Sequence, residues 1–201
     1  MTTARRRPKH DPKVSENEIL NAAEQFLSEH PFRDLNVDEV MRRTGLKRPA
    51  FYVHFRDKHD LALRLVENIG KELFTIADQW LKGDSPQEDL RRTLVGLVEV
   101  YMQHGRVLRA FGEAAGGDER VDVAYRTLVQ DFINAAAQHI KEEQEAGRIK
   151  KNLDVEETAK ALIWLEERYL SEVFGRSSQV DPEVAIRVLQ NIWLSTLYGA
   201  N

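Results

Sequence analysis

Apolar residues recur every three or four positions along nearly the whole chain, a spacing that predicts helices rather than strands. In residues 15–29 they follow one helix face, at Ile19, Ala22, Ala23, Phe26 and Leu27. Ser15 and Glu18 have the spacing of a capping box and predict that the first helix begins at Ser15. Pro31 ends it, because the residue before a proline avoids the helical conformation.

Capping residues and glycines divide the rest of the chain in the same way. Asn36, Asp57, Asp154 and Asp181 stand where helices are expected to begin, and Ser85 with Glu88 forms a second capping-box pattern. About nine helices joined by short loops are predicted, an all-α fold. Their expected ranges are 15–29, 37–44, 48–55, 58–82, 86–104, 107–115, 119–146, 155–174 and 182–198.

Composition narrows the class of protein. The 201 residues include no cysteine, which excludes disulfides, thiolate metal sites and cysteine nucleophiles. No apolar run follows the basic residues at the N-terminus, so no signal peptide is expected. No stretch approaches the roughly 18 apolar residues that span a bilayer. We therefore expect a cytoplasmic protein that makes no membrane contact.

Charge is distributed unevenly although the whole chain carries only −4. Residues 1–14 hold five basic side chains and one acidic one, a net charge of +4. Residues 1–60 carry +2, and residues 61–201 carry −6. A basic head on an acidic body is typical of a protein that contacts phosphates at one end only.

Residues 37–55, VDEVMRRTGLKRPAFYVHF, form the most informative segment. Their pattern predicts two short helices joined by a sharp turn at Gly45, a conformation that favours glycine. Val37, Val40, Leu46 and Phe51 are placed to hold the two helices together. This is the layout of a helix-turn-helix, whose second helix enters the DNA major groove. By spacing alone, a helical hairpin within a bundle fits equally well.

The longer segment 19–65 resembles the N-terminal domain of the TetR family of transcriptional repressors. The resemblance rests on Ile19 with Ala22-Ala23, Phe26-Leu27, Val37–Val40, Gly45-Leu46, Phe51-Tyr52 with His54-Phe55, and Lys58 followed by Leu61. Met41 departs from the small residue usual in the family and implies local repacking. Lys47 and Ala50 replace hydroxyl residues that often reach phosphate in relatives, which changes the expected contact set.

Geometry and the resemblance together give the candidate DNA-binding residues: Thr44, Lys47, Arg48, Pro49, Ala50, Tyr52, His54 and Lys58. Arg48 is the candidate for base reading, because a guanidinium binds guanine with two hydrogen bonds. Tyr52, His54 and Lys58 resemble the family's phosphate contacts. Residues 1–14 are expected to form a flexible basic arm that either enters a minor groove or stays solvated. The implied division is 1–14 arm, 15–60 DNA-binding domain, and 61–201 ligand-binding and dimerisation domain.

Residues 85–201, with ALIWLEERYL and the ending NIWLSTLYG, resemble the EthR-type branch, which implies an interior site for lipophilic ligands. Relatives carry amides at the positions of Ile163 and Glu166, so the ligand's identity does not transfer. Glu167 shares a helix with Trp164 and is costly to bury unless it is paired or neutral. The candidate ligand-binding residues are Val98, Tyr101, Met102, Phe111, Leu128, Val129, Phe132, Trp164, Glu167 and Trp193. Each of them, taken singly, fits an ordinary core better than a pocket, and the polar members favour a pocket for the group.

The hypothesis is a homodimeric repressor that binds a palindromic double-stranded operator and is released by a small lipophilic effector. The last two helices are expected to form the dimer interface, because each is apolar on more than one face. An activator on the same fold is one alternative, and a helical interaction module without DNA binding is another. An enzyme is disfavoured, because the sequence offers no acid–base pair, nucleophile elbow, metal motif or phosphate loop, and no cofactor is expected.

Overall fold

The computed structural model describes residues 11–81, 85–176 and 180–199. Within these ranges the protein contains eight α-helices and two short 3₁₀ helices, with no strand, so the predicted all-α class is confirmed. The elements are α1 (Pro12–Glu29), η1 (Phe32–Asp34), α2 (Val37–Arg43), η2 (Arg48–Ala50), α3 (Phe51–His54), α4 (Lys58–Leu81), α5 (Pro86–Ala115), α6 (Glu119–Glu145), α7 (Val155–Phe174) and α8 (Pro182–Tyr198).

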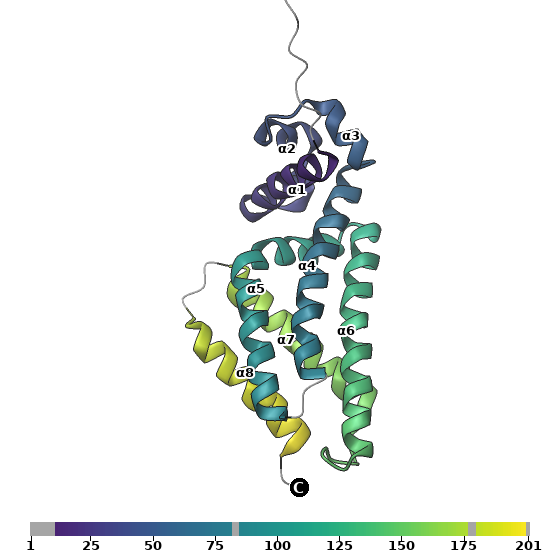
Figure 1. Ribbon diagram of the computed structural model, residues 1–201, viewed down its shortest axis with the longest axis vertical. Coiled ribbons are helices and arrows are strands. Elements are labelled where there is room, and N and C mark those ends of the chain that lie inside the picture. Colours follow the sequence, from purple (N-terminus) through teal and green to yellow (C-terminus); the bar gives the residue numbers. More distant parts are fainter. Residues whose placement is uncertain (1–10, 82–84, 177–179, 200–201) are drawn as a thin grey trace, which may run out of the picture.

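The helices form a small head on an elongated body (Figure 1). Helices α1, α2 and α3 make up the head, and α4 runs from the head down into the body. There α4 packs against α5 and α6, while α7 packs against both α5 and α6 and α8 lies against α5. One long helix therefore joins the head to the body.

Side-chain caps fix most helix starts where the sequence predicts them. The Asn36 side chain accepts a hydrogen bond from the Glu39 amide at 2.9 Å. The Asp57 carboxylate accepts from the amides of His59 at 2.8 Å and Asp60 at 2.9 Å. Each cap satisfies amides that a helix start would otherwise leave without a partner, so these boundaries follow from local sequence.

Both predicted capping boxes are wrong in detail. Helix α1 begins at Pro12 with Asp11 as its cap, and Ser15 lies buried inside the helix, where its hydroxyl is bonded to the carbonyl of Pro12. Ser85 makes no side-chain cap bond, and its own amide donates to the Asp89 carboxylate at 2.7 Å. Aspartate followed by proline is the stronger start signal at α1, because proline fits the first helical turn.

The two helices predicted over 86–104 and 107–115 are a single helix, α5. Figure 1 shows α5 changing direction beneath the head while staying helical. Gly105 lies within it, and a Cβ added there would come within 3.0–3.1 Å of the backbone of Phe174 and Gly175. The glycine therefore allows close packing against the end of α7, and it does not end the helix.

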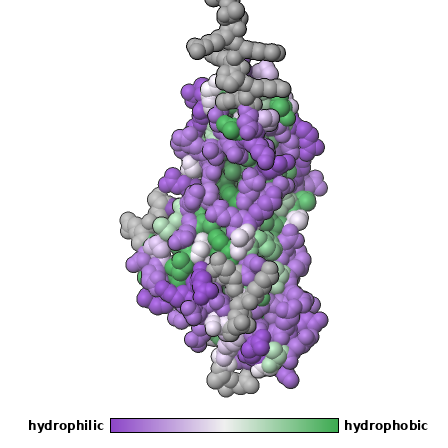
Figure 2. Space-filling view, in the orientation of Figure 1, coloured by the Kyte–Doolittle hydropathy of each residue, from purple (hydrophilic) through white to green (hydrophobic). Residues whose placement is uncertain are grey.

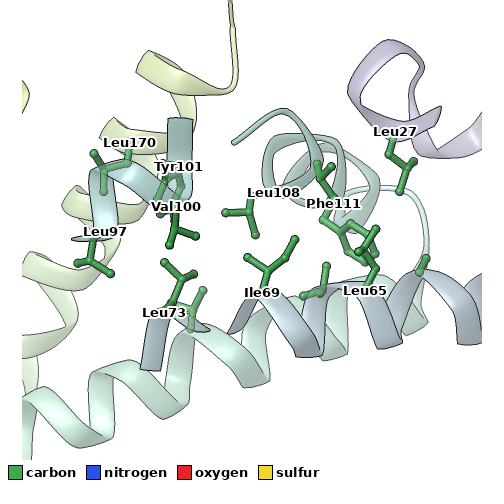
Figure 3. Packing of buried hydrophobic residues seen from close by; sticks show 14 of the residues in the cluster. Leu27, Leu65, Ile69, Leu73, Leu97, Val100, Tyr101, Leu108, Phe111 and Leu170 are labelled. Carbon is green, nitrogen blue, oxygen red and sulfur yellow. The ribbon is translucent and has the colours of Figure 1, made fainter. Parts of the chain in front are cut away.

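The hydrophobic core is continuous from head to body and includes residues from Ile19 of α1 to Leu197 of α8. In Figure 3, Leu65 and Ile69 of α4 lie opposite Phe111 and Leu108 of α5, and Leu73 lies opposite Val100. Phe111 also contacts Phe32 below the head, with ring centroids 5.9 Å apart. Among the described helices, none is long and apolar enough to cross a membrane.

Candidate nucleic-acid interface and ligand cavity

The turn between α2 and α3 is built around Gly45, whose φ is +51°. This left-handed conformation is cheap only for glycine. Thr44 precedes it, and its hydroxyl donates to the Met41 carbonyl at 2.9 Å and accepts from the Leu46 amide at 3.2 Å. The turn is thus fixed by local bonds, and it sets the direction in which η2 and α3 leave.

Buried side chains hold the two short helices together. Val40 and Phe51 are fully buried, and Phe55 and Met41 are nearly so. The large Met41 side chain is therefore accommodated inside the head. With the apolar side of α3 fixed in this way, its opposite side faces solvent.

The exposed side of η2 and α3 carries most of the predicted DNA-binding residues. Lys47, Arg48 and Pro49 are exposed and Ala50 is half-buried. Tyr52 is 52% exposed, and its hydroxyl accepts a hydrogen bond from the Arg48 guanidinium at 3.1 Å. Arg48 also pairs with the Asp38 carboxylate on α2. Figure 2 shows the visible surface of the head as mostly hydrophilic.

Val53 is a further candidate DNA-binding residue that was not among those predicted from the sequence. It is 74% exposed on α3, next to Tyr52. A β-branched apolar side chain held in solvent has no role in the core, and apolar groups of this kind contact thymine methyls in DNA grooves. The sequence signal for its exposure is its position between Tyr52 and His54, because Phe51 and Phe55 already form the packed side of this helix.

His54 and Lys58 are only half exposed and already have partners. Nε2 of His54 lies 2.8 Å from the Ser15 hydroxyl of α1. Since that hydroxyl is already bonded to the Pro12 carbonyl, the histidine N–H is the donor to serine. Nζ of Lys58 donates to the Arg33 carbonyl at 3.4 Å and lies 5.3 Å from the centroid of the Phe32 ring. Both side chains therefore also tie α3 and α4 to the rest of the head.

The basic residues Arg5, Arg6 and Arg7 of the predicted arm lie outside the described residues. Within the described residues, no group of three or more His, Cys, Asp or Glu side chains is placed to hold a metal ion.

A narrow apolar cavity of about 80 Å³ lies inside the body. Its lining comes from α4, α5, α6, α7 and α8. The residues are Val66, Leu73, Ala77, Trp80, Leu81, Leu90, Thr93, Leu97, Tyr101, Leu108, Phe111, Tyr125, Leu128, Val129, Phe132, Ala135, Ala136, Ile163, Glu166, Glu167 and Trp193. This volume is below the roughly 300–1,000 Å³ of occupied ligand sites, so a sizeable ligand must push side chains apart.

Seven of the ten predicted ligand-binding residues line the cavity: Tyr101, Phe111, Leu128, Val129, Phe132, Glu167 and Trp193. The other three do not. Val98 is buried in the core away from it, and Met102 is 56% exposed. Trp164 borders a neighbouring surface groove. Met102 follows Tyr101 by one residue on α5 and projects to the solvent side of the helix, whereas Tyr101 is buried.

Glu166 lines the cavity although it is not among the predicted ligand-binding residues. It stands four residues after Leu162 and four before Leu170, both of them buried, so a glutamate occupies the buried stripe of α7. That spacing is the signal that identifies it. Burial raises the pKa of Glu166 to about 7, and the Trp193 indole opposes the shift.

The same apolar surroundings also shift the pKa of Glu167 and of two nearby tyrosines. Burial raises the pKa of Glu167, although a hydrogen bond with Tyr125 and the charge of Arg168 act in the opposite direction. Burial, with a smaller contribution from the charge of Glu167, also raises the pKa of the Tyr101 and Tyr125 hydroxyls. The cavity thus favours neutral or charge-compensated groups.

Two family models match the chain. "Bacterial regulatory proteins, tetR family" matches residues 19–65, and "Transcriptional regulator EthR, C-terminal domain" matches residues 90–199. The HTH-type transcriptional regulator EthR of Mycobacterium tuberculosis is 30% identical over 189 residues, which cover 91% of this chain and 87% of that protein. The EthR of Mycolicibacterium smegmatis is 28% identical over 197 residues, covering 96% and 89%.

Solved structures agree with the fold. The fatty acid degradation regulator FadR of Bacillus halodurans superposes with a TM-score of 0.78 at 15% identity, covering 95% of this chain and 97% of that one. NalD of Pseudomonas aeruginosa, described as the secondary repressor of a multidrug efflux pump, gives 0.74 at 19% identity, covering 94% and 98%. Relatives that match most of the chain are named as transcriptional regulators, not as enzymes. The chain therefore belongs to the TetR family of helix-turn-helix transcriptional regulators, in its EthR-like subgroup.

Proposed function

We propose that the protein is a transcriptional repressor that binds a palindromic operator as a homodimer in the cytoplasm and is released by a lipophilic effector. One observation carries the proposal: α4 begins in the head and lines the cavity through Val66, Leu73, Ala77 and Trp80. Whatever enters the cavity must therefore press on the helix that positions the head.

The head supplies the DNA contacts. Lys47, Arg48, Pro49 and Ala50 open the recognition segment, with Arg48 reading a guanine edge and the others contacting bases or the flanking backbone. To contact a base in the DNA groove, the Arg48 side chain must leave its ion pair with Asp38. The candidate phosphate contacts are Thr44, Tyr52, His54 and Lys58. Residues 1–14 would add a basic arm, and residues 15–60 would make up the DNA-binding domain.

The dimer is proposed to form through α7 and α8, in the body of residues 61–201. Leu165 on α7 is 40% exposed, and Val184 and Val188 on α8 are 37% and 39% exposed. These apolar side chains are exposed on the two helices proposed for the interface, where a second copy of the chain would cover them. A two-fold dimer sets two recognition helices about 34–36 Å apart, one turn of DNA, and requires a palindromic site.

Polar contacts link the head and α4 to the rest of the body. Arg120 of α6 pairs with Asp57, the cap of α4, at 3.1 Å. Nε2 of His59 lies 2.6 Å from Asp118, the cap of α6. His104 of α5 pairs with Glu24 of α1. A displacement of α4 or α5 by an effector would pass to the head through these contacts.

The energy required sets a lower limit on effector size. Shifting a two-state protein from 1:99 to 99:1 needs about 5.5 kcal/mol of difference in binding free energy. Burying about 250 Å² of apolar surface supplies about 6 kcal/mol. An effector of that size suffices only if its burial is confined to the state that cannot bind DNA.

The test uses labelled duplexes from the region upstream of the protein's own gene, with binding followed by fluorescence anisotropy at increasing salt. Specific binding that weakens steeply with salt is expected. The double variant Arg48→Ala/Tyr52→Ala should lose operator binding and remain dimeric. Arg92→Ala, which removes a similarly exposed and paired arginine of the body, should bind like the wild type. Operator binding by the double variant at wild-type affinity would refute the assigned recognition segment.

A further inference from the structure

The ionisable side chains that line the cavity include carboxyl groups but no basic group. Two carboxyl groups, Glu166 and Glu167, belong to its lining, and no Lys, Arg or His side chain does. Six aromatic side chains complete the surroundings: Trp80, Tyr101, Phe111, Tyr125, Phe132 and Trp193. An apolar space with two acidic groups and no basic group would attract a positively charged ligand and disfavour an anionic one.

The neighbouring basic residues do not neutralise these carboxyls. Arg168 is exposed and pairs with Glu172 at 2.9 Å, and Arg126 pairs with Asp122 at 2.8 Å. Across the described residues, neither Glu166 nor Glu167 forms a salt bridge. A buried carboxylate without a counter-ion is costly, and a cation brought by a ligand would remove that cost.

A route for such a ligand lies beside the cavity. A surface groove shares Tyr125 and Glu167 with the cavity lining, and its other polar or aromatic lining residues are Asp122, Trp164 and the two arginines Arg126 and Arg168, which pair with Asp122 and Glu172. Tyr125 and Glu167 therefore stand between the groove and the interior. A ligand that displaced them would bring its charged end to Glu167 and its apolar end toward α4.

Building on the proposed function, we infer that the effector is a lipophilic amine, whose ammonium group lies at Glu166 and Glu167 and whose hydrocarbon part fills the apolar cavity against α4. The aromatic side chains of the lining add cation–π attraction for the same group. Burial raises the pKa of both carboxyls, and the ligand's positive charge would counter that effect.

The experiment compares three probes that share an eight-carbon chain: n-octylammonium, 1-octanol and octanoate. Their affinities for the full-length protein are measured by calorimetry and from tryptophan fluorescence, to which Trp80 and Trp193 of the cavity and Trp164 of the groove contribute. The variants are Glu166→Gln, Glu167→Gln and the double variant, with circular dichroism to check folding. The control is Glu156→Gln, an exposed glutamate of the same helix, outside the cavity.

Octylammonium is expected to bind the wild type and the control at least about 10-fold more tightly than octanol, because hydrogen bonds to charged groups are the strong ones. The double variant should lose this preference and keep its affinity for octanol. Octanol binding as tightly as octylammonium, a preference that survives in the folded double variant, or binding of none of the probes would each overturn the inference.

Operator binding, measured in parallel with each probe, separates this inference from the proposed function. If octanol releases the operator and octylammonium does not, the inference that the effector is an amine is refuted and the repressor proposal still holds. Absence of operator binding by the ligand-free protein, both to its upstream region and in selection from random duplexes, would refute the repressor proposal itself.

Discussion

Replacing Glu166 by glutamine should stabilise the protein, and the gain should depend on pH. The folded-state pKa of Glu166 is about 7 against an ordinary value of 4.5. Between these values the folded protein binds more protons than the unfolded chain, so this carboxyl's contribution to stability is fully present below pH 4.5 and is lost as the pH rises through about 7. The difference corresponds to about 3 kcal/mol. Because Glu166 is only partly buried by surface area, we expect about 2 kcal/mol.

Glutamine keeps the shape of the side chain and an oxygen that can face the Trp193 indole, and it never ionises. The free energy of unfolding should be measured by urea denaturation at pH 5 and pH 8, at one protein concentration because the stability of the proposed dimer would depend on it. The variant should exceed the wild type by about 2 kcal/mol at pH 8 and by much less at pH 5. Glu156→Gln should show no such difference. A gain of equal size at both pH values, or no gain at pH 8, would refute the assignment of a raised pKa to Glu166.

Three further predictions concern the head and the dimer. Gly45→Ala should lower the free energy of unfolding, measured by urea denaturation, by about 1–2 kcal/mol. The cause is backbone strain alone, because φ is +51° and the added Cβ would meet nothing within 4 Å. An unchanged free energy of unfolding would contradict this prediction. Lys47→Ala should reduce the slope of log affinity against log salt by about 1, with Lys71→Ala on the body as control. An unchanged slope would exclude Lys47 as a phosphate contact. Val188→Lys should convert the proposed dimer to monomer in analytical ultracentrifugation, since it places charge on the exposed apolar side of α8. A dimer that persists would place the interface elsewhere.

The head was largely predictable from the sequence because its determinants are local. Asn36 and Asp57 cap helices through amides two or three residues away, and Gly45 is needed by the conformation of its own backbone. The apolar positions of the head fix which side of each short helix is buried, and the remaining side is exposed by default. Such signals act within one or two helical turns, so they are visible without the rest of the fold.

The errors arise where the decisive contact is distant in sequence. Gly105 resembles a helix break, but its lack of a side chain serves the approach of α5 to Phe174, 69 positions later in the chain. Ser15 resembles a cap, but it is buried against His54 of α3. Local patterns cannot distinguish these cases, because a glycine or serine has the same signature whether it ends a helix or meets another one.

The sequence by itself determined the helical class, the helix-turn-helix and the apolar character of the body, because periodicity reports which side of each helix avoids water. Only the tertiary structure decided which of those apolar residues surround a cavity. Val98 and Tyr101 have equal claims by spacing, yet only Tyr101 reaches the cavity, and Glu166 joins it from α7. The lining is assembled from five helices, and whether a buried side chain meets another side chain or an open space depends on how all five are placed.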